Sequence, residues 1–198
     1  MTARIAPVPP TGNAPDIQEL LDFGTEGTGG ASNVFLTLAR NPELFRGWMA
    51  FTSDFYTPTA LAPRHRELLI LRTAWRCRSD YEWGQHVRMA HAAGLTDAEI
   101  TAVTGDIDAA AWSATDAALL QTVDELIDDH TVAPSTWAAL ARDFDEAHLI
   151  EVLLLVGSYI GLAGFLNAVG VEREAGVSGL PTTHQPTTGQ KEKNRCLA

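Results

Sequence analysis

The stretch LAPRHRELLILRTAWRCRSDYEWGQHVRMAHAAGL, residues 61–95, decides the fold of this chain. It has the pattern of two helices joined by a short turn. Pro63 suits a first helical turn, because its missing N–H costs no hydrogen bond there. The first helix should run to about Arg76, and residues 79–80 (Ser-Asp) can cap a second helix. Gly94 is a suitable stop for that second helix.

Three polar side chains share one face of the second predicted helix. Ser79, Glu82 and His86 lie three and four residues apart, which places them on the same side. A carboxylate and an imidazole are the commonest protein groups for proton transfer near neutral pH. The same spacing also fits a solvated Glu–His surface pair. A metal site is a third interpretation, and it would need another ligand such as Glu67 or His65.

Composition and charge limit the class of protein. The chain has 198 residues, of which 45% are hydrophobic and 20% charged, as expected for one globular domain. Its formal net charge is −11, which argues against nucleic acid and anionic membrane as partners. Cys77 and Cys196 form neither a CxxC motif nor a disulfide framework, so a reducing cytoplasm is expected.

Helix signals recur every 10–20 residues, and no stretch alternates like a β-strand. The sequence therefore predicts an all-α single domain. We expect an irregular N-terminal arm over residues 1–30, a helical domain over 31–173, and a disordered or draped tail over 174–198. Besides the central pair, the predicted helices cover residues 16–22 (short), 32–40, 42–56, 96–104, 113–129, 134–142 and 146–171.

The last predicted helix is apolar enough to be considered as a membrane span. It has no second spanning partner and no strongly basic flank, so we expect no membrane and instead a helix buried on nearly all sides. Gly157, Gly161 and Gly164 would let another helix approach it closely.

The runs RELLILRTAWRCRSDYEWGQHVRMAHAAGL and LIEVLLLVGSYIGLAGFLNAVGVE resemble the carboxymuconolactone decarboxylase family, over roughly residues 35–173. The resemblance implies an all-helical, alkylhydroperoxidase D-like bundle. In the peroxidase branch of this fold, a glutamate precedes a CxxC motif and a histidine. Those positions fall on Glu67, Ser79, Glu82 and His86. Peroxidase chemistry needs a low-pKa thiolate and a second thiol, so dithiol peroxidase activity is not expected here.

The resemblance instead implies decarboxylation of a small lactone or keto/vinylogous carboxylic acid, without metal or organic cofactor. Under this hypothesis His86 delivers the proton, Glu82 tunes or reloads it, and Glu67 orients the imidazole from the preceding helix. The predicted substrate-binding side chains are Arg72 and Arg76 for the carboxylate, with Trp75, Tyr81 and Ser79 in the pocket wall.

Two other functions remain open at this stage. The same acid–base pair would serve an isomerase or ring-modifying enzyme in a catabolic or secondary-metabolite pathway. A non-catalytic small-molecule binding or scaffold protein would use the Glu–His pair structurally. The resemblance also implies a homo-oligomer, a trimer or hexamer, in which a neighbouring subunit can complete the site. The physiological substrate is not readable from the sequence.

Overall fold

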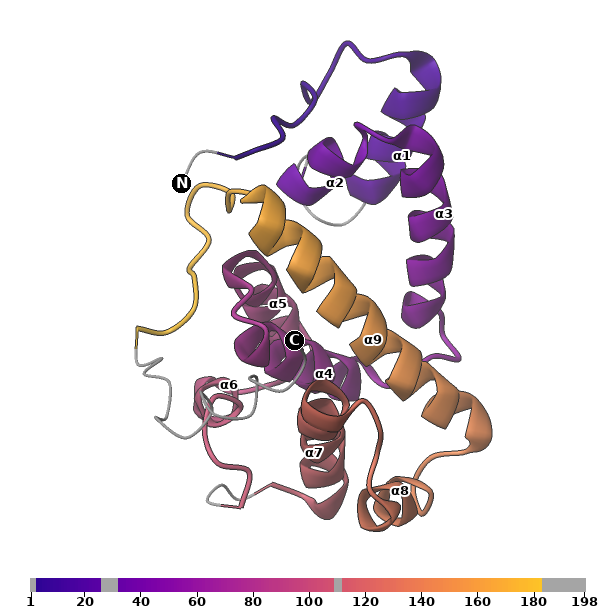
Figure 1. Cartoon of the computed structure of the whole chain (residues 1–198), viewed down its shortest axis with the longest axis vertical. Helices are drawn as coiled ribbons and strands as arrows, with labels where there is room; N and C mark the ends of the chain where they lie inside the picture. The colour runs from indigo at the N-terminus through magenta and orange to yellow at the C-terminus, as the bar shows by residue number, and fades with distance from the viewer. Residues whose placement is uncertain (1–2, 26–31, 109–111, 183–198) are drawn as a thin grey trace, which may run out of the picture.

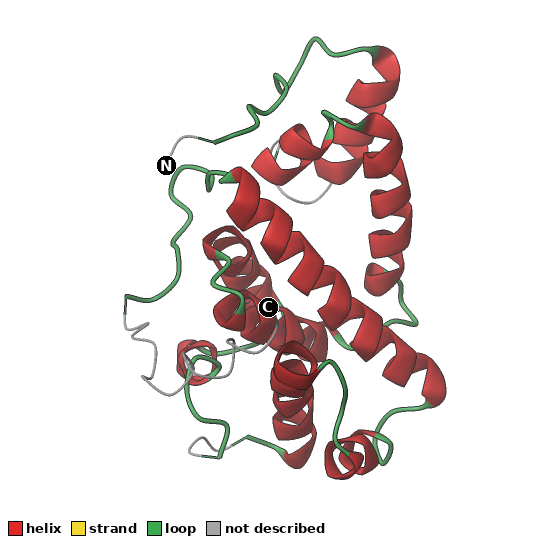
Figure 2. Cartoon of the chain, in the orientation of Figure 1, coloured by secondary structure: helices red, strands yellow, loops and turns green. Residues whose placement is uncertain are grey.

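The computed structural model describes residues 3–25, 32–108 and 112–182 (Figure 1). Within these residues the chain is helical and has no strand, and Figure 2 shows the helices joined by loops. The prediction of an all-α fold is confirmed. In chain order the elements are α1 (Pro15–Thr25), α2 (Asn33–Leu38), α3 (Pro42–Ser53), η1 (Asp54–Tyr56), α4 (Pro63–Arg76), α5 (Asp80–Ala92), α6 (Asp97–Ala102), α7 (Ala114–Asp129), α8 (Pro134–Leu140) and α9 (Glu146–Val169).

Side-chain caps fix where several helices begin. Asn41, Ser113 and Asp145 each accept a hydrogen bond from a backbone N–H in the first turn of α3, α7 and α9. Thr96 and Glu99 form both bonds of a capping box at α6. Each cap satisfies an N–H group that has no partner inside its helix. These starts agree with the sequence prediction.

The predicted helix over residues 42–56 ends early. α3 stops at Ser53, and one turn of 3-10 helix, η1, follows it. The tighter turn buries Phe55 and leaves Tyr56 43% exposed, with its hydroxyl turned toward α9. This correction matters because it brings Tyr56 to the candidate site.

Helix α4 lies at the centre of the fold, packed between α5, α7 and α9. Residues 66–74 are all buried. One core cluster joins α4 to α7, α8 and α9, and another joins it to α5, α6 and α7. A helix enclosed in this way must find internal partners for its polar side chains, because an unpaired buried charge is costly. The partners of Arg66, Glu67 and Arg72 therefore show which of these side chains hold the fold together and which belong to a functional site.

The first three helices form a small layer with its own core. Val8, Leu21, Leu36 and Phe45 pack together, and the Val8 N–H donates to the Leu36 carbonyl at 3.0 Å. The expectation of an irregular arm is thus wrong for the helical part of the arm, where burial of Leu21 stabilises a helix longer than the predicted short one. In Figure 1 this layer covers the upper part of α9.

Helix α9 crosses the molecule diagonally and is only partly enclosed (Figure 1). It is long and apolar enough to cross a membrane, yet only 39% of its most apolar 18-residue window is buried. The expectation of burial on nearly all sides is wrong, because Ile150 and Leu154 are 58% and 49% exposed. A single apolar helix of this kind also occurs in soluble bundles. Glu151, the carboxylate in the middle of this helix, accepts a hydrogen bond from the Leu61 N–H, which lies 3.0 Å from each of its two oxygens.

The segment after α9, the start of the predicted tail, is draped over α5. A Cβ atom added at Gly84 would lie 2.4 Å from the Ser178 carbonyl oxygen, so the segment approaches α5 closely there. The Glu174 carboxylate accepts hydrogen bonds from Tyr81, Gln85 and the Asn33 N–H. It therefore ties α2, α5 and this segment together. The remainder of the predicted tail, with Cys196, lies outside the described residues.

Candidate acid–base site

The site is organised around a hydrogen bond between α4 and α5. Nδ1 of His86 lies 2.7 Å from Oε2 of Glu67. Glu67 is fully buried and His86 is 7% exposed. When Glu67 is ionised, its carboxylate accepts the proton on Nδ1, which leaves Nε2 to exchange a proton with a substrate. The predicted contact from the preceding helix is therefore present in the structure.

Glu82 lies one helical turn before His86 and is 2% exposed. Neither of its carboxyl oxygens has a hydrogen-bond partner among the described residues. Burial raises the pKa of Glu82 to about 8, and the neighbouring Ser79 hydroxyl offsets this only in part. At neutral pH Glu82 is thus a carboxylic acid inside the protein, and it carries a proton.

Three side chains that the sequence analysis did not select for the site complete its surroundings. Arg66 donates from Nε to Glu67 at 3.3 Å and from Nη1 to the Phe55 carbonyl at 3.1 Å. Its guanidinium also lies 4.3 Å from the centre of the Tyr56 ring. The Tyr56 hydroxyl lies 2.9 Å from that of Tyr159. One cation and two tyrosines therefore surround the Glu67–His86 pair.

The sulfur chemistry of the peroxidase branch has no equivalent at this site. Ser79 is fully buried, and its hydroxyl has no hydrogen-bond partner among the described residues. Ser79 also occupies the N-cap position of α5 without making a side-chain cap bond. Cys77 is nearby, but burial raises the pKa of its thiol to about 11. A thiol that stays protonated at neutral pH is a poor nucleophile toward a peroxide.

The two predicted carboxylate-binding arginines have structural partners instead. Arg72 donates from Nε and Nη2 to Asp124, at 2.9 and 2.6 Å, and from Nη1 to the carbonyls of Val103 and Gly105. Arg76 pairs with Asp124 and with Asp128. Every guanidinium nitrogen of Arg72 is thus engaged in tying α4 to α7 and the end of α6. The structure corrects the substrate-binding assignment of both arginines.

This correction gives a first prediction. Replacing Arg72 with Met should lower the free energy of unfolding by roughly 2–4 kcal/mol, because a buried ion pair and two carbonyl bonds are lost. Activity per folded molecule should stay within a factor of two. Urea unfolding and steady-state kinetics on the same preparation check both parts. A stable variant that had lost substrate affinity would restore Arg72 to the site.

The two predicted aromatic wall residues face away from the Glu67–His86 pair. Trp75 packs near Trp83, with ring centroids 6.2 Å apart, beside the α4–α5–α6 core cluster. The Tyr81 hydroxyl contacts Ser32, the Val34 N–H and Glu174. The Trp75 side chain, on α4, thus serves packing. The Tyr81 side chain, on α5, is held by hydrogen bonds to the start of α2 and to the draped segment.

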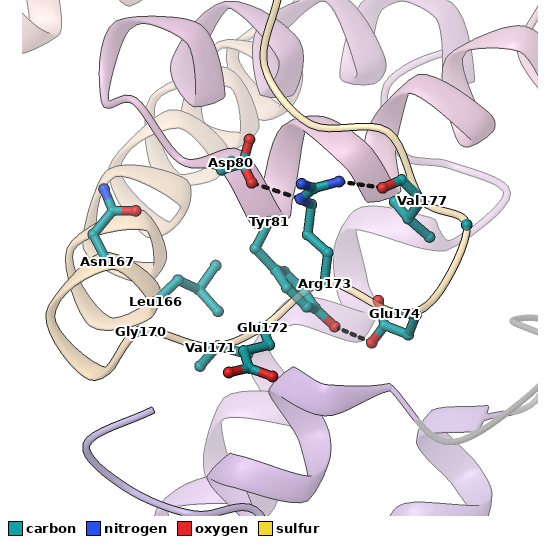
Figure 3. Close-up of a pocket in the computed structure, with 11 residues that line it drawn as sticks. Asp80, Tyr81, Leu166, Asn167, Gly170, Val171, Glu172, Arg173, Glu174 and Val177 are labelled. Carbon is teal, nitrogen blue, oxygen red and sulfur yellow. Dashed lines mark hydrogen bonds and ion pairs between the residues drawn. The ribbon is translucent and has the colours of Figure 1, made fainter. Parts of the chain in front are cut away.

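A pocket of about 750 Å³ lies on that other side of α5, between the end of α9 and the draped segment (Figure 3). Asp80 and Tyr81 line it, and Arg173 bridges Asp80 and the Val177 carbonyl. None of the predicted acid–base residues lines this pocket. The arginine that lines it, Arg173, is already paired with Asp80, and Glu174 accepts from Tyr81, so we do not place the chemistry there.

A metal site is not supported by the described part of the chain. No group of three or more His, Cys, Asp or Glu side chains within it is arranged to hold an ion. Of the two suggested additional ligands, Glu67 is already bound to His86 and Arg66. His65 is 3.8 Å from Asp116 and packs edge-on against Phe144. The His86 imidazole and the Glu67 carboxylate, which bind each other here, are better suited to proton transfer than to holding a metal ion.

Comparison with known proteins agrees with the fold and the family resemblance. The model of the carboxymuconolactone decarboxylase family matches residues 42–124, which include Glu67, Glu82 and His86. This match agrees with the sequence resemblance over the central part of the chain. No curated protein sequence matches the chain significantly.

Solved structures with an alkylhydroperoxidase D-like fold superpose on most of the chain. An uncharacterised peroxidase-related protein from Ralstonia eutropha JMP134, described as an alkylhydroperoxidase AhpD core, is 19% identical with a TM-score of 0.72, covering 86% of this chain and 93% of its own. A peroxidase-related protein from Silicibacter sp. TM1040 is 14% identical with a TM-score of 0.75, covering 88% and 94%. The debrominase Bmp8, solved with 2,3,4-tribromopyrrole, is 15% identical with a TM-score of 0.72, covering 88% and 94%. These likenesses establish the fold.

Proposed function

We propose that the protein is a cofactor-free acid–base enzyme that decarboxylates a small lactone or keto/vinylogous carboxylic acid, with proton delivery by His86. The observation that supports this most is the buried 2.7 Å bond between His86 and Glu67, with the neutral carboxyl of Glu82 one helical turn away. Perturbed ionisable groups packed together inside a protein are typical of catalytic sites. The same groups would also catalyse an isomerisation, so the reaction test below separates the two.

The proton balance of the reaction matches the groups present. The bond between the substrate and its carboxylate breaks, CO₂ leaves, and the bonding electrons pass onto a conjugated carbonyl oxygen as an enolate. The imidazolium of His86 then gives its Nε2 proton to carbon, while Glu67 stabilises the charged ring beforehand. Glu82 returns a proton to His86, and water reprotonates Glu82. One proton is consumed for each CO₂ released.

The absence of Arg72 and Arg76 from the site is compatible with this reaction. Negative charge leaves the carboxylate as CO₂ forms, so a cation held on the carboxylate would stabilise the substrate more than the transition state. Catalysis gains only from contacts that strengthen in the transition state. A neutral Glu82 also avoids a second negative charge beside an anionic substrate. Ser79, whose buried hydroxyl is next to this carboxyl, is the one predicted substrate-binding residue that we retain.

The test is CO₂ release together with the ultraviolet change from γ-carboxymuconolactone and a panel of β-keto and vinylogous acids, in metal-free buffer with EDTA. Turnover with one CO₂ per substrate consumed, unchanged by EDTA, supports the proposal. An ultraviolet change without CO₂ would assign an isomerase. Tight ligand binding without any conversion would assign a binding or scaffold protein, and both results would overturn the decarboxylase. A cytoplasmic location is part of the same proposal.

We also propose that a second copy of the chain covers the outer face of α9. Ile150 and Leu154 are exposed there, and Gly157, Gly161 and Gly164 have no neighbouring atom within 4 Å of an added Cβ. An apolar face of this kind, without large side chains along half its length, suits close helix packing between subunits.

The expected result is a shift in mass. The wild type should elute as a trimer or hexamer. Leu154→Glu should give a smaller oligomer or a monomer, because the substitution would bury a charge in the contact between subunits. Light scattering after gel filtration measures this. Leu44→Glu, at another exposed leucine on α3, is the matched control and should leave the mass unchanged. A monomeric wild type would contradict the proposal.

A further inference from the structure

Helix α9 brings a tyrosine hydroxyl to the acid–base site. The ring of Tyr159 meets the ring of His86 edge-on, with centroids 5.2 Å apart and an interplanar angle of 82°. Tyr159 is 8% exposed, and its hydroxyl lies 2.9 Å from the hydroxyl of Tyr56. The Tyr159 ring is therefore held beside the imidazole, and its hydroxyl is paired with that of Tyr56.

The proton count of this pair leaves one donor available. Two hydroxyls hold two protons, and the hydrogen bond between them uses one. If Tyr56 donates to Tyr159, the proton of Tyr159 is left inside the protein, and no acceptor for it is found among the described residues. If the bond runs the other way, Tyr159 donates to Tyr56, and the proton left over is that of Tyr56. The pair can thus switch direction when a negatively charged oxygen arrives.

The hydroxyl of Tyr159 stays protonated at working pH. Burial raises its pKa well above the ordinary value, and any negative charge that forms on Tyr56, Glu67 or Glu82 raises it further. The Arg66 guanidinium over Tyr56 adds a positive charge at the far end of the pair.

We infer that Tyr159 donates the hydrogen bond that stabilises the enolate oxygen of the substrate, and that Tyr56 is the positioning residue that orients it. The inference rests on the proposed decarboxylation. An enolate has its carbon and its oxygen close together, so the proton donor and the oxygen donor must be neighbours, as His86 and Tyr159 are. The substrate class is accordingly a planar acid whose carboxylate-bearing carbon is conjugated to a carbonyl group.

Two single-atom deletions test the inference by kinetics. Tyr159→Phe should lower kcat about 100-fold with little change in KM, because an oxyanion donor acts mainly in the transition state. Tyr56→Phe keeps that donor and loses only its orientation, so kcat should fall less, by about 3- to 10-fold. Thermal unfolding of both variants shows whether folding is intact.

A binding measurement supplies a readout that does not depend on turnover. The probes are 4-hydroxy-3-nitrobenzoate, which presents a phenolate oxygen, and 3-nitrobenzoate, which lacks it. In the wild type at pH 7.5 the hydroxylated probe should bind at least 10-fold more tightly. Tyr159→Phe should remove that preference and leave the affinity for 3-nitrobenzoate unchanged. A structural role for Tyr159 would weaken both probes together.

The outcomes separate this inference from the proposed function. Wild-type CO₂ release that persists within threefold in Tyr159→Phe overturns the inference alone. A probe preference that depends on Tyr159, without CO₂ release from any acid, overturns the decarboxylase and keeps the oxyanion donor. Failure of both probes to bind the wild type overturns the inference, because the site then takes no planar acid of this class.

Discussion

Replacing Glu67 with Gln should lower kcat by about 1,000-fold or more. The carboxylate accepts the Nδ1 proton of His86 and stabilises the imidazolium, whereas an amide can donate to Nδ1 and hold the wrong tautomer. The measurement is steady-state kinetics on the acid that the wild type decarboxylates. Nitrogen-15 NMR of the His86 ring should show a changed tautomer in the same variant.

Glu99→Gln is the matched control for this substitution. Glu99 also binds an arginine, Arg64 at 2.6 Å, but belongs to the capping box of α6. Gln keeps that box, so activity should be unchanged. A Glu67→Gln variant that is folded and turns over within threefold of the wild type would show that the His86–Glu67 bond is structural only.

Replacing Glu82 with Gln should make the protein more stable and less active. The folded-state pKa of about 8 lies above the value of an unfolded glutamate, so the folded protein binds the extra proton between these two values. Wild-type stability is therefore highest at low pH within this window and falls as the pH rises toward 8. Gln carries no charge in either state, so its stability advantage should grow by roughly 2–3 kcal/mol between pH 5.5 and pH 8. Urea unfolding at both pH values measures it.

The activity of the same variant tests the proton-return role of Glu82. In the wild type, kcat should fall above about pH 8 as Glu82 loses its proton. In Glu82→Gln, kcat should be about 10- to 100-fold lower and should lack that alkaline decline. Glu43→Gln, at an exposed glutamate of α3, should change neither property. Unaltered activity with raised stability would leave Glu82 without a catalytic role.

The parts of the fold that local chemistry determines could be predicted from the sequence. Pro63 and Gly94 mark the ends of the central helix pair, and both lie where the structure begins or stops those helices. Caps such as Asn41 and Asp145 bind backbone N–H groups three residues further on, so they can be predicted from the local sequence alone. The approach of Glu67 to His86 came from the family resemblance, because helical spacing relates residues of one helix only.

Contacts between distant residues explain what sequence reasoning missed. Arg72 binds Asp124, which is 52 residues later in the sequence, and Tyr56 forms a hydrogen bond with Tyr159, which is 103 residues later. No local pattern distinguishes an arginine that binds such a partner from one that binds a substrate. Likewise, the apolar composition of α9 did not reveal that one of its faces is exposed, because hydropathy reports the residues and not their neighbours. The few polar groups inside that apolar run, Glu151, Ser158, Tyr159 and Asn167, were the signal available.

The most direct test of the account is the loss and rescue of turnover at His86. His86→Ala should abolish CO₂ release, by at least 1,000-fold, and added imidazole should restore part of it by supplying the missing acid. His91→Ala, one turn and a half further along α5 at a half-exposed histidine, is the matched control and should retain full activity. Residual turnover of His86→Ala near the wild-type rate, without dependence on imidazole, would contradict an acid–base centre at this residue.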